Sequence, residues 1–308
     1  MELRQILSKT LYDIMKQNEK VCLLDADLSK PNGTFPLYKD FPNRTFNVGV
    51  SEQNMAGMAA GLSAYGFVPV IVTFTPFATR RICDQVAVSI AYAKQKVIII
   101  GTDPGITAEM NGGTHMSFED IGVMRSIPTM LIIDIVDGTQ LQQALFQAID
   151  YPGPVYLRMP RKAKVKVFDE NYQFKLGKAD VLKEGTDVTI IATGTMVYES
   201  IQALKLLELD NINPELISVN TIKPLDKDTI LKSVKKTKKV VVCENHNLIG
   251  GLFSAVAELL STEYPVKMKG VGVKDRFGQV GKYHELLESY EMTPQDIASV
   301  VKGHIYER

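Results

Sequence analysis

Short apolar runs rich in β-branched residues alternate with segments of helical periodicity along the first half of the chain. The strand-like runs are Val21–Asp25, Val68–Phe74, Val97–Gly101, Met130–Ile133 and Val155–Arg158. The helical patterns around and between them are Gln5–Gln17, Asn54–Tyr65, Arg80–Tyr92, Phe118–Arg125 and Thr139–Ile149. Consecutive parallel strands need a crossover connection, which is usually a helix. The alternation therefore predicts an α/β fold whose mostly parallel sheet is flanked by helices.

A basic stretch without periodicity, residues 159–167, interrupts this alternation. A second series follows, with strand-like runs at Val188–Thr193, Glu215–Val219, Val240–Glu244 and Val266–Val273 and helical patterns at Met196–Leu209, Lys227–Thr237 and Leu252–Leu260. A chain of 308 residues also exceeds what one ordinary core accommodates. We therefore predict two α/β domains, residues 1–164 and 179–308, joined by a linker over residues 165–178.

The charge balance and the apolar content exclude several classes of protein. Thirty-five basic residues balance thirty-five acidic ones, so no overall positive field attracts nucleic acid or anionic lipid. No stretch approaches the ~20 apolar residues of a membrane-spanning helix, and the N-terminus has no signal-peptide pattern. The three cysteines lack metal-ligand spacing. We expect a cytoplasmic protein with reduced thiols that binds neither nucleic acid nor membrane.

A single carboxylate, Glu52, opens a helical segment rich in Gly and Ala. A first-turn Glu is favoured by the helix dipole, so the residue alone does not indicate function. Its surroundings are more specific. The run Gly49-Val50-Ser51-Glu52-Gln53 resembles the G-I/V-x-E-Q/H/F signature of transketolases, deoxyxylulose-phosphate synthases and the β subunits of 2-oxoacid dehydrogenases.

Other segments agree with this resemblance in order and spacing. Asp25–Leu28 is similar to the family's S/D-A-D-L segment, Thr73–Phe77 to T-F-x-x-F, and Gly112–His115 to the end of D-G-x-T-H. Further similarity runs through Gly153–Arg158, Thr221–Asp226 and Glu244–His246. The chain is identified as a member of the transketolase family, corresponding to its C-terminal section. The resemblance implies a thiamine diphosphate pyrimidine-binding fold followed by a transketolase C-terminal-like domain.

The resemblance implies thiamine diphosphate as the cofactor. This cofactor becomes a nucleophile when its thiazolium C2 proton is lost, and a carboxyl group must favour the imino tautomer of its aminopyrimidine. We predict Glu52 as that catalytic acid, because a dry site favours a protonated form that can share its proton with the ring. Phe74 and Phe77 are predicted to stack on the pyrimidine, with core packing as the alternative. Asp27 matches an acidic residue near the cofactor.

The resemblance also implies residues at the substrate end of the site. His115, in a Gly-rich loop, would hydrogen-bond donor hydroxyls and the reaction intermediate. Arg4 and Arg158 match two arginines that bind sugar phosphate, with a surface or structural role as the alternative. Asn111 replaces an acidic residue of the family, and Asp103 stands where a phosphate-binding His is expected. Because a carboxylate there would repel a phosphate, a modified or unphosphorylated acceptor sugar stays open.

The family holds the cofactor diphosphate and Mg²⁺ through a Gly-Asp-Gly motif, which this sequence lacks. We therefore assign no metal ligands to the chain. We predict instead a partner subunit of the N-terminal transketolase type that carries the motif and binds the metal. The active site would then be shared between chains in an α2β2 assembly.

The leading hypothesis is a subunit of a split transketolase that transfers a two-carbon ketol unit from a ketose, or ketose phosphate, to an aldose. A deoxyxylulose-phosphate synthase half and a 2-oxoacid dehydrogenase β-type subunit are alternatives within the superfamily. An inactive regulatory or scaffolding subunit is the non-enzyme alternative. The run Glu244–His246 in the second domain is compatible with a turn, an interface or an ion site, and the sequence does not decide between them.

Overall fold

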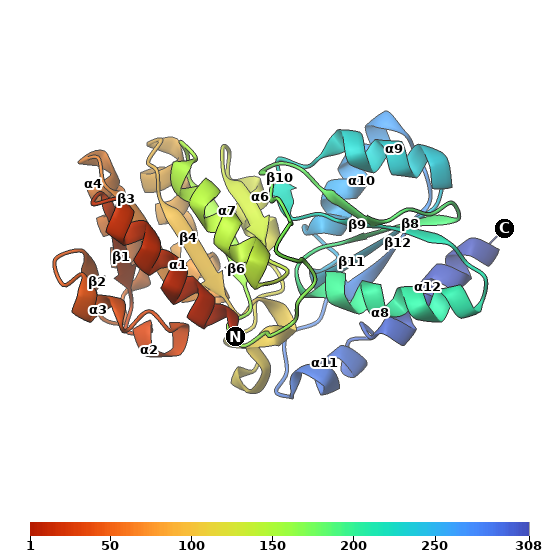
Figure 1. The fold of residues 1–308 in the computed structure, drawn as a ribbon, viewed down its shortest axis with the longest axis horizontal. Coiled ribbons are helices and arrows are strands. Elements are labelled where there is room, and N and C mark those ends of the chain that lie inside the picture. The colour runs from red at the N-terminus through yellow and green to blue at the C-terminus, as the bar shows by residue number, and fades with distance from the viewer. Residues whose placement is uncertain (308) are drawn as a thin grey trace. The chain divides into compact units, whose positions relative to one another are not determined.

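A computed structural model describes residues 1–307. The chain folds into two compact units. The first comprises Met1–Pro104 and Val123–Leu176, and the second comprises Gly105–Gly122 and Gly177–Arg308. Each unit is a mostly parallel sheet flanked by helices (Figure 1), which confirms the predicted fold class. The segment 105–122 packs with the second unit although it lies inside the predicted domain 1–164. The boundaries at residues 164 and 179 stay a prediction.

The sheet of the first unit is parallel in all its pairings. Its strands lie in the order β5-β6-β4-β3-β1-β2. In chain order they are β1 (Val21–Asp25), β2 (Thr45–Asn47), β3 (Val68–Phe74), β4 (Ile98–Thr102), β5 (Leu131–Asp134) and β6 (Val155–Met159). Every residue of the central strands β3, β4 and β6 is buried, which explains why these strands appear in the sequence as continuous apolar runs.

Helices α1 (Leu3–Gln17) and α7 (Gly138–Asp150) lie side by side against the sheet of the first unit (Figure 1). Their apolar faces meet the strands in one core, in which Leu7, Leu145 and Ile100 are fully buried. The other helical segments are α2 (Ser29–Asn32), α3 (Leu37–Asp40), α4 (Glu52–Ala64), α5 (Thr75–Ala78), η1 (Arg80–Ile82) and η2 (Gln85–Tyr92). Helix α6 (Asp120–Ser126) begins in segment 105–122, and its residues from Val123 on belong to the first unit.

The sheet of the second unit has the strand order β12-β11-β8-β9-β7 and is parallel except for the edge strand β7. The strands are β7 (Asp180–Lys183), β8 (Val188–Ala192), β9 (Pro214–Ser218), β11 (Val240–Asn247) and β12 (Met268–Val273), and a short strand β10 spans Thr221–Lys223. The helical segments are η3 (Gly105–Asn111), α8 (Thr195–Leu209), α9 (Lys227–Thr237), α10 (Leu252–Glu263), α11 (Tyr283–Ser289) and α12 (Pro294–Tyr306).

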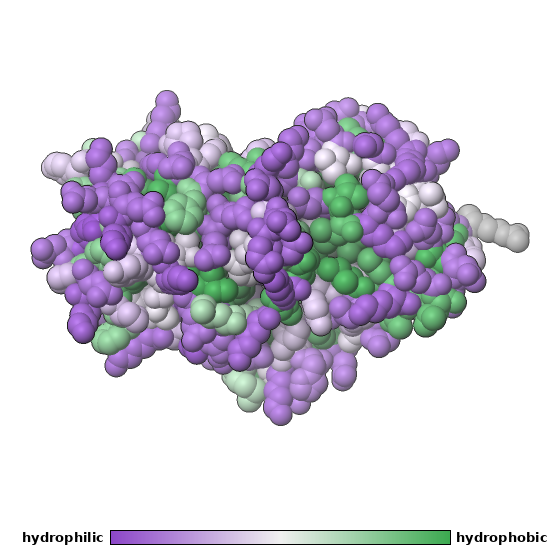
Figure 2. Space-filling model, viewed as in Figure 1, coloured by the Kyte–Doolittle hydropathy of each residue, from purple (hydrophilic) through white to green (hydrophobic). Residues whose placement is uncertain are grey.

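Hydrophilic side chains cover most of the face shown in Figure 2. Apolar side chains are buried in a core within each unit. Within residues 1–307, no helix combines the length and the apolar character that crossing a membrane requires.

Candidate active site

Glu52 is the first residue of α4 and is only 4% exposed. The turn before it is tight: Gly49 has φ +73° and its carbonyl oxygen accepts a hydrogen bond from the Ser51 N–H. A buried carboxylate needs a compensating partner. Here Oε1 of Glu52 accepts a hydrogen bond of 2.8 Å from Nη1 of Arg81, which lies on η1. The predicted catalytic acid is therefore buried at a helix N-terminus and ion-paired.

Two aromatic rings lie where β3 ends. Phe74 is the last residue of β3 and Phe77 belongs to α5, and their ring centroids are 6.0 Å apart. The guanidinium carbon of Arg81 stands 3.7 Å from the Phe77 ring centroid, a cation–π contact. Arg81 thus joins the Glu52 carboxylate to the aromatic surface. A buried carboxylate next to two tilted aromatic rings fits a flat, hydrogen-bonding heterocycle such as an aminopyrimidine.

Asp103 and Arg161 form a buried ion pair beside these rings. Asp103 follows β4 and Arg161 follows β6, and these strands are neighbours in the sheet. The backbone N–H of Arg161 donates to Oδ1 of Asp103 at 2.7 Å, and its Nε–H donates to Oδ2 at 2.5 Å. Burial raises the pKa of Asp103, whereas the charge of Arg161 and its hydrogen bonds act in the opposite direction.

The guanidinium carbon of Arg161 also lies 4.5 Å from the centroid of the Phe74 ring. Phe74 therefore links the ion pair to the pair of aromatic rings, and the residues form one continuous group at the carboxyl ends of β3, β4 and β6. Parallel α/β sheets bind ligands at this edge. We call this group the carboxyl-edge site; its members are Glu52, Phe74, Phe77, Arg81, Asp103 and Arg161.

Arg4 lies next to this site. Its backbone N–H donates to the carbonyl oxygen of Arg161 at 3.0 Å. Its guanidinium donates through Nε to Glu2 at 2.7 Å and through Nη1 to the carbonyl oxygen of Pro31 at 3.3 Å. The structure thus brings together Arg4 and Arg161, and the side chain of Arg4 stays partly exposed.

Arg158 has different surroundings. It is 1% exposed, and its Nη1 donates to Oδ2 of Asp134 at 2.8 Å. The two residues are partners in the β5–β6 register, so the ion pair is internal to the sheet. The substrate role expected for Arg158 stays a prediction, but this geometry is that of a structural ion pair. Sequence reasoning did not select Arg161, although it stands only three residues later in the same run.

Asp27 is held by the turn that leads to Glu52. It has a left-handed backbone, φ 63°. Its N–H donates to Oδ1 of Asn47 at 3.0 Å, and the Asn47 amide donates back to Oδ1 of Asp27 at 3.3 Å. Oδ1 of Asn47 also accepts from the Gly49 N–H at 2.9 Å. Asn47 therefore ties Asp27 to the segment that carries the predicted catalytic acid.

Asn111 and His115 belong to the second unit, at the end of η3 and in the loop after it. Gly112 has φ +69°, a conformation that glycine allows and most residues resist. Nδ1 of His115 lies 2.8 Å from the Thr114 hydroxyl, a hydrogen bond whose direction depends on the imidazole tautomer. Asn111 is exposed and His115 is half-buried. Two of the predicted substrate residues, Asn111 and His115, therefore lie in the same segment of the second unit.

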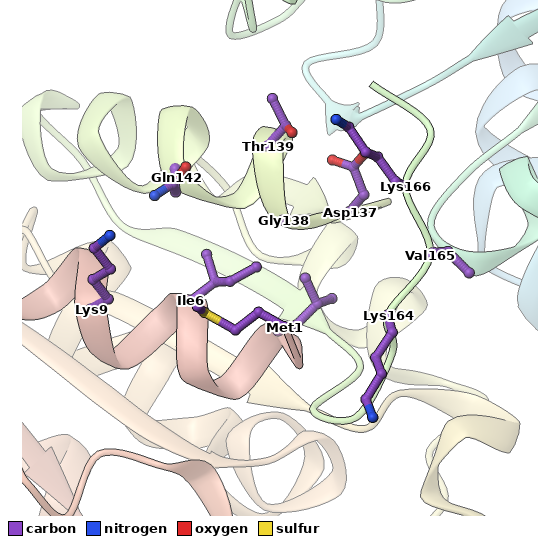
Figure 3. Close-up of a pocket in the computed structure, with 11 residues that line it drawn as sticks. Met1, Ile6, Lys9, Asp137, Gly138, Thr139, Gln142, Lys164, Val165 and Lys166 are labelled. Atoms are coloured by element: carbon purple, nitrogen blue, oxygen red, sulfur yellow. The ribbon is translucent and has the colours of Figure 1, made fainter. Parts of the chain in front are cut away.

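A cavity of about 400 Å³ lies elsewhere in the first unit, between α1, the start of α7 and residues 164–166 (Figure 3). Three lysines line it, Lys9, Lys164 and Lys166, but no predicted site residue does. The start of α7 is already capped, because Oδ1 of Asp137 accepts from the Gln140 N–H at 3.0 Å. The predicted cofactor-binding residues therefore lie outside this cavity.

These features define an α/β protein with a candidate cofactor site at one edge of a parallel sheet, and similarity to known proteins specifies it further. Residues 1–165 match the family "Transketolase, pyrimidine binding domain", and residues 177–297 match "Transketolase, C-terminal domain". The chain belongs to the transketolase family, and it resembles members in which the C-terminal section is a separate subunit.

Three relatives illustrate the similarity. The 6-deoxy-6-sulfo-D-fructose transketolase subunit SqwH of Clostridium sp. (strain MSTE9) is 45% identical over 295 residues, covering 96% of this chain and 92% of that protein. An apulose-4-phosphate transketolase subunit from Phocaeicola vulgatus is 32% identical, covering 96% and 94%. A solved structure described as a split gene transketolase, an inactive β4 tetramer, has a TM-score of 0.90 at 38% identity, covering 99% and 98%.

Removing Arg158 is expected to destabilise the fold. Arg158→Ala leaves the buried carboxylate of Asp134 without its ion-pair partner, which costs about 3–5 kcal/mol in the free energy of unfolding. The double variant Arg158→Met, Asp134→Asn removes both charges and is expected to recover most of that loss. Urea denaturation of the wild-type chain, Arg158→Ala and the double variant measures the free energy of unfolding of each. A stable Arg158→Ala subunit whose complex has only a raised KM for substrate would contradict the structural role.

Proposed function

We propose that this chain is the β-type subunit of a split, thiamine diphosphate-dependent transketolase that moves a two-carbon ketol unit from an anionic ketose to an aldose. The observation that carries the proposal is the carboxyl-edge site, in which buried Glu52 and two aromatic rings are linked through Arg81. The match of nearly the whole chain to separate transketolase subunits supports the same proposal.

The residues of the first unit fit the pyrimidine half of the cofactor. Phe74 and Phe77 supply a stacking surface, and Glu52 supplies a buried carboxyl group for a ring nitrogen. Asp27, tied to the same turn through Asn47, completes the group near the cofactor. When bound, thiamine diphosphate would supply a nucleophilic carbon for the ketose carbonyl. Glu52 would hold or release the proton that sets the tautomer of the ring before that carbon is deprotonated.

Arg81 has to move for Glu52 to play this part. In the structure its guanidinium occupies the face of Phe77 and hydrogen-bonds the Glu52 carboxylate. A ring nitrogen that shares a proton with Glu52 competes for the same oxygen. Arg81 is 43% exposed, so its side chain can turn toward solvent without unpacking the core. We infer that Arg81 is exchanged for the cofactor ring when the cofactor binds.

The substrate we propose is a sugar that carries a tetrahedral oxyanion. The names of two relatives specify a sulfo-sugar and a sugar phosphate, so both of their substrates bear such a group. In this chain the guanidinium of Arg161 lies over the Phe74 ring, and the backbone of Arg4 is hydrogen-bonded to that of Arg161. Guanidinium groups suit sulfonate and phosphate oxygens alike.

Because Asp103 is paired with Arg161, the repulsion of phosphate that the sequence predicts for Asp103 is no longer expected. An isolated carboxylate at position 103 would repel a phosphate, but here its charge is balanced by the guanidinium at 2.5 Å. We infer that Asp103 orients Arg161 toward the oxyanion. We further propose that Asn111 and His115 contact substrate hydroxyls, as expected from the family resemblance.

Partner subunits complete the proposed assembly. The sequence lacks the Gly-Asp-Gly motif, so a partner of the N-terminal transketolase type is proposed to bind the diphosphate and Mg²⁺. Exposed apolar residues on and beside α4 and η2 support self-association of this chain. They are Met58, Tyr65, Phe67, Val88 and Tyr92. Two copies of each chain would form an α2β2 enzyme.

The purified chain is expected to be inactive and to gain ketol transfer only with its partner. The reason is that the proposed metal and diphosphate site lies on the other subunit. Activity is measured with thiamine diphosphate, Mg²⁺ and a ketose donor, for each subunit alone and for the mixture. The control is a partner whose Gly-Asp-Gly aspartate is replaced by Ala. Robust transfer by this chain alone would overturn the proposal.

Replacing Arg161 is expected to affect anionic substrates selectively. Arg161→Gln removes the proposed oxyanion contact, which is worth about 1.5–3 kcal/mol for a charged hydrogen bond, so kcat/KM for an anionic ketose falls roughly 10- to 100-fold. Transfer from the same ketose without its charged group changes little. The double variant Asp103→Asn, Arg161→Gln controls for the unpaired buried carboxylate. Equal losses for both donors would contradict the oxyanion role.

A further inference from the structure

The loop that carries Asn111 and His115 belongs to the second unit, where the end of β11 contacts it. Segment 105–122 belongs to that unit although residues 123–176, which follow it in the chain, belong to the first. A loop of this length without regular strands is mobile unless contacts fix it. The residues that fix it include the run Glu244–His246, for which the sequence left a turn, an interface or an ion site open.

Asn245 anchors the start of the segment. Its Oδ1 accepts a hydrogen bond of 3.0 Å from the N–H of Ile106, and both residues are almost fully buried. The contact is so close that a Cβ on Gly105 would lie 2.1 Å from the same oxygen. Gly105 also has φ +56°. Only glycine at position 105 therefore allows the amide of Asn245 to approach this closely.

The end of the segment, near residues 118–120, is contacted by His246 and Asn247, the two residues that follow Asn245 in β11. The backbone N–H of Asn247 donates to the carbonyl oxygen of Phe118 at 2.9 Å. The imidazole of His246 is fully buried, and its Nε2 lies 3.9 Å from Oδ1 of Asp120. Its Nδ1 lies 2.6 Å from the Asn247 carbonyl oxygen, to which it donates in the matching tautomer. Strand β11 thus contacts both ends of the segment.

Glu244 keeps this end of β11 rigid. Its two carboxylate oxygens accept hydrogen bonds from the N–H groups of Leu252 and Phe253, at 2.6 and 2.9 Å. Leu252 and Phe253 are the first residues of α10, so the carboxylate caps that helix and accepts from N–H groups that have no partner within the helix. The anchor residues Asn245 and His246 therefore stand on a fixed support.

The middle of the segment meets a second loop of the same unit. A Cβ on Gly113 would lie 2.6 Å from the carbonyl oxygen of Gly278, and one on Gly112 would lie 2.9 Å from a methyl group of Val280. These glycines immediately precede Thr114 and His115. The backbone on the N-terminal side of His115 is therefore packed against residues 278–280.

We propose that Asn245, supported by His246, is a positioning residue that holds the Asn111–His115 loop in its substrate-binding conformation. The proposal rests on the proposed function, because it gives Asn111 and His115 their substrate contacts. Small displacements of such contacts lower rates strongly, since productive geometry is narrow. Asn245 itself touches Ile106 and Gly105 and not the substrate. The second unit then contributes to catalysis by fixing a loop.

The experiment compares Asn245→Ala with Asn220→Ala in the reconstituted complex. Asn220 is equally buried in the same unit, where it hydrogen-bonds Ser218 and Asp180. Asn245→Ala is expected to speed amide hydrogen exchange over residues 105–118 and to lower kcat/KM about tenfold, the effect of one lost hydrogen bond. Deuterium exchange at cofactor C2 stays at the wild-type rate, because it needs no substrate. Asn245→Asp keeps an acceptor for Ile106 and restores part of kcat/KM.

Several results would overturn the positioning role. They are unchanged amide exchange over residues 105–118, a kcat/KM equal to wild type, or an equal loss in Asn220→Ala. If Asn245→Ala does not fold, Asn245→Ser, which shortens the side chain that accepts from Ile106, replaces it, with the same expected and contradicting results. A wild-type complex that exchanges C2 but transfers no ketol unit overturns the proposed reaction, and with it the role of Asn245.

Discussion

The parallel register of β3, β4 and β6 is the constraint on which the carboxyl-edge site depends. Phe74 pairs with Thr102, and Thr102 pairs with Met159, so the three strands end at one level. Residues that follow them are therefore neighbours although they are distant in sequence. Asp103 and Arg161 meet for this reason, 58 positions apart. The aromatic surface of Phe74 lies beside them as a consequence of the same register.

Buried charge determines what each part of the first unit can do. Arg158 and Asp134 form an ion pair inside the sheet, where both side chains are almost fully buried. Glu52 is also buried, but its partner Arg81 comes from a short, partly exposed helix and can be exchanged. A permanent buried ion pair serves stability or specificity, whereas a replaceable partner leaves a carboxylate available to a ligand. The difference in exposure between Arg158 and Arg81 separates these two cases.

The sequence predicted most strands because burial on both faces produces continuous apolar runs, as in Val68–Phe74 and Val188–Ala192. It also singled out Glu52 and the aromatic pair, since these lie in short contiguous motifs. It missed Arg161, because the partner Asp103 is found only through strand pairing. The sequence analysis did not predict helix α12, although Thr293 at its N-cap and Pro294 at its first position are typical signals of a helix start.

The rate of deuterium exchange at cofactor C2 in the assembled enzyme tests the central claim, that Glu52 activates the cofactor. An amide hydrogen-bonds the pyrimidine but cannot share a titrating proton, so Glu52→Gln should slow exchange by about 10²–10⁴-fold. Glu19→Gln, at an exposed position, serves as the control and should leave exchange unchanged. Thermal midpoints should show both variants folded. A Glu52→Gln complex that exchanges C2 at the wild-type rate would contradict the placement of the cofactor site.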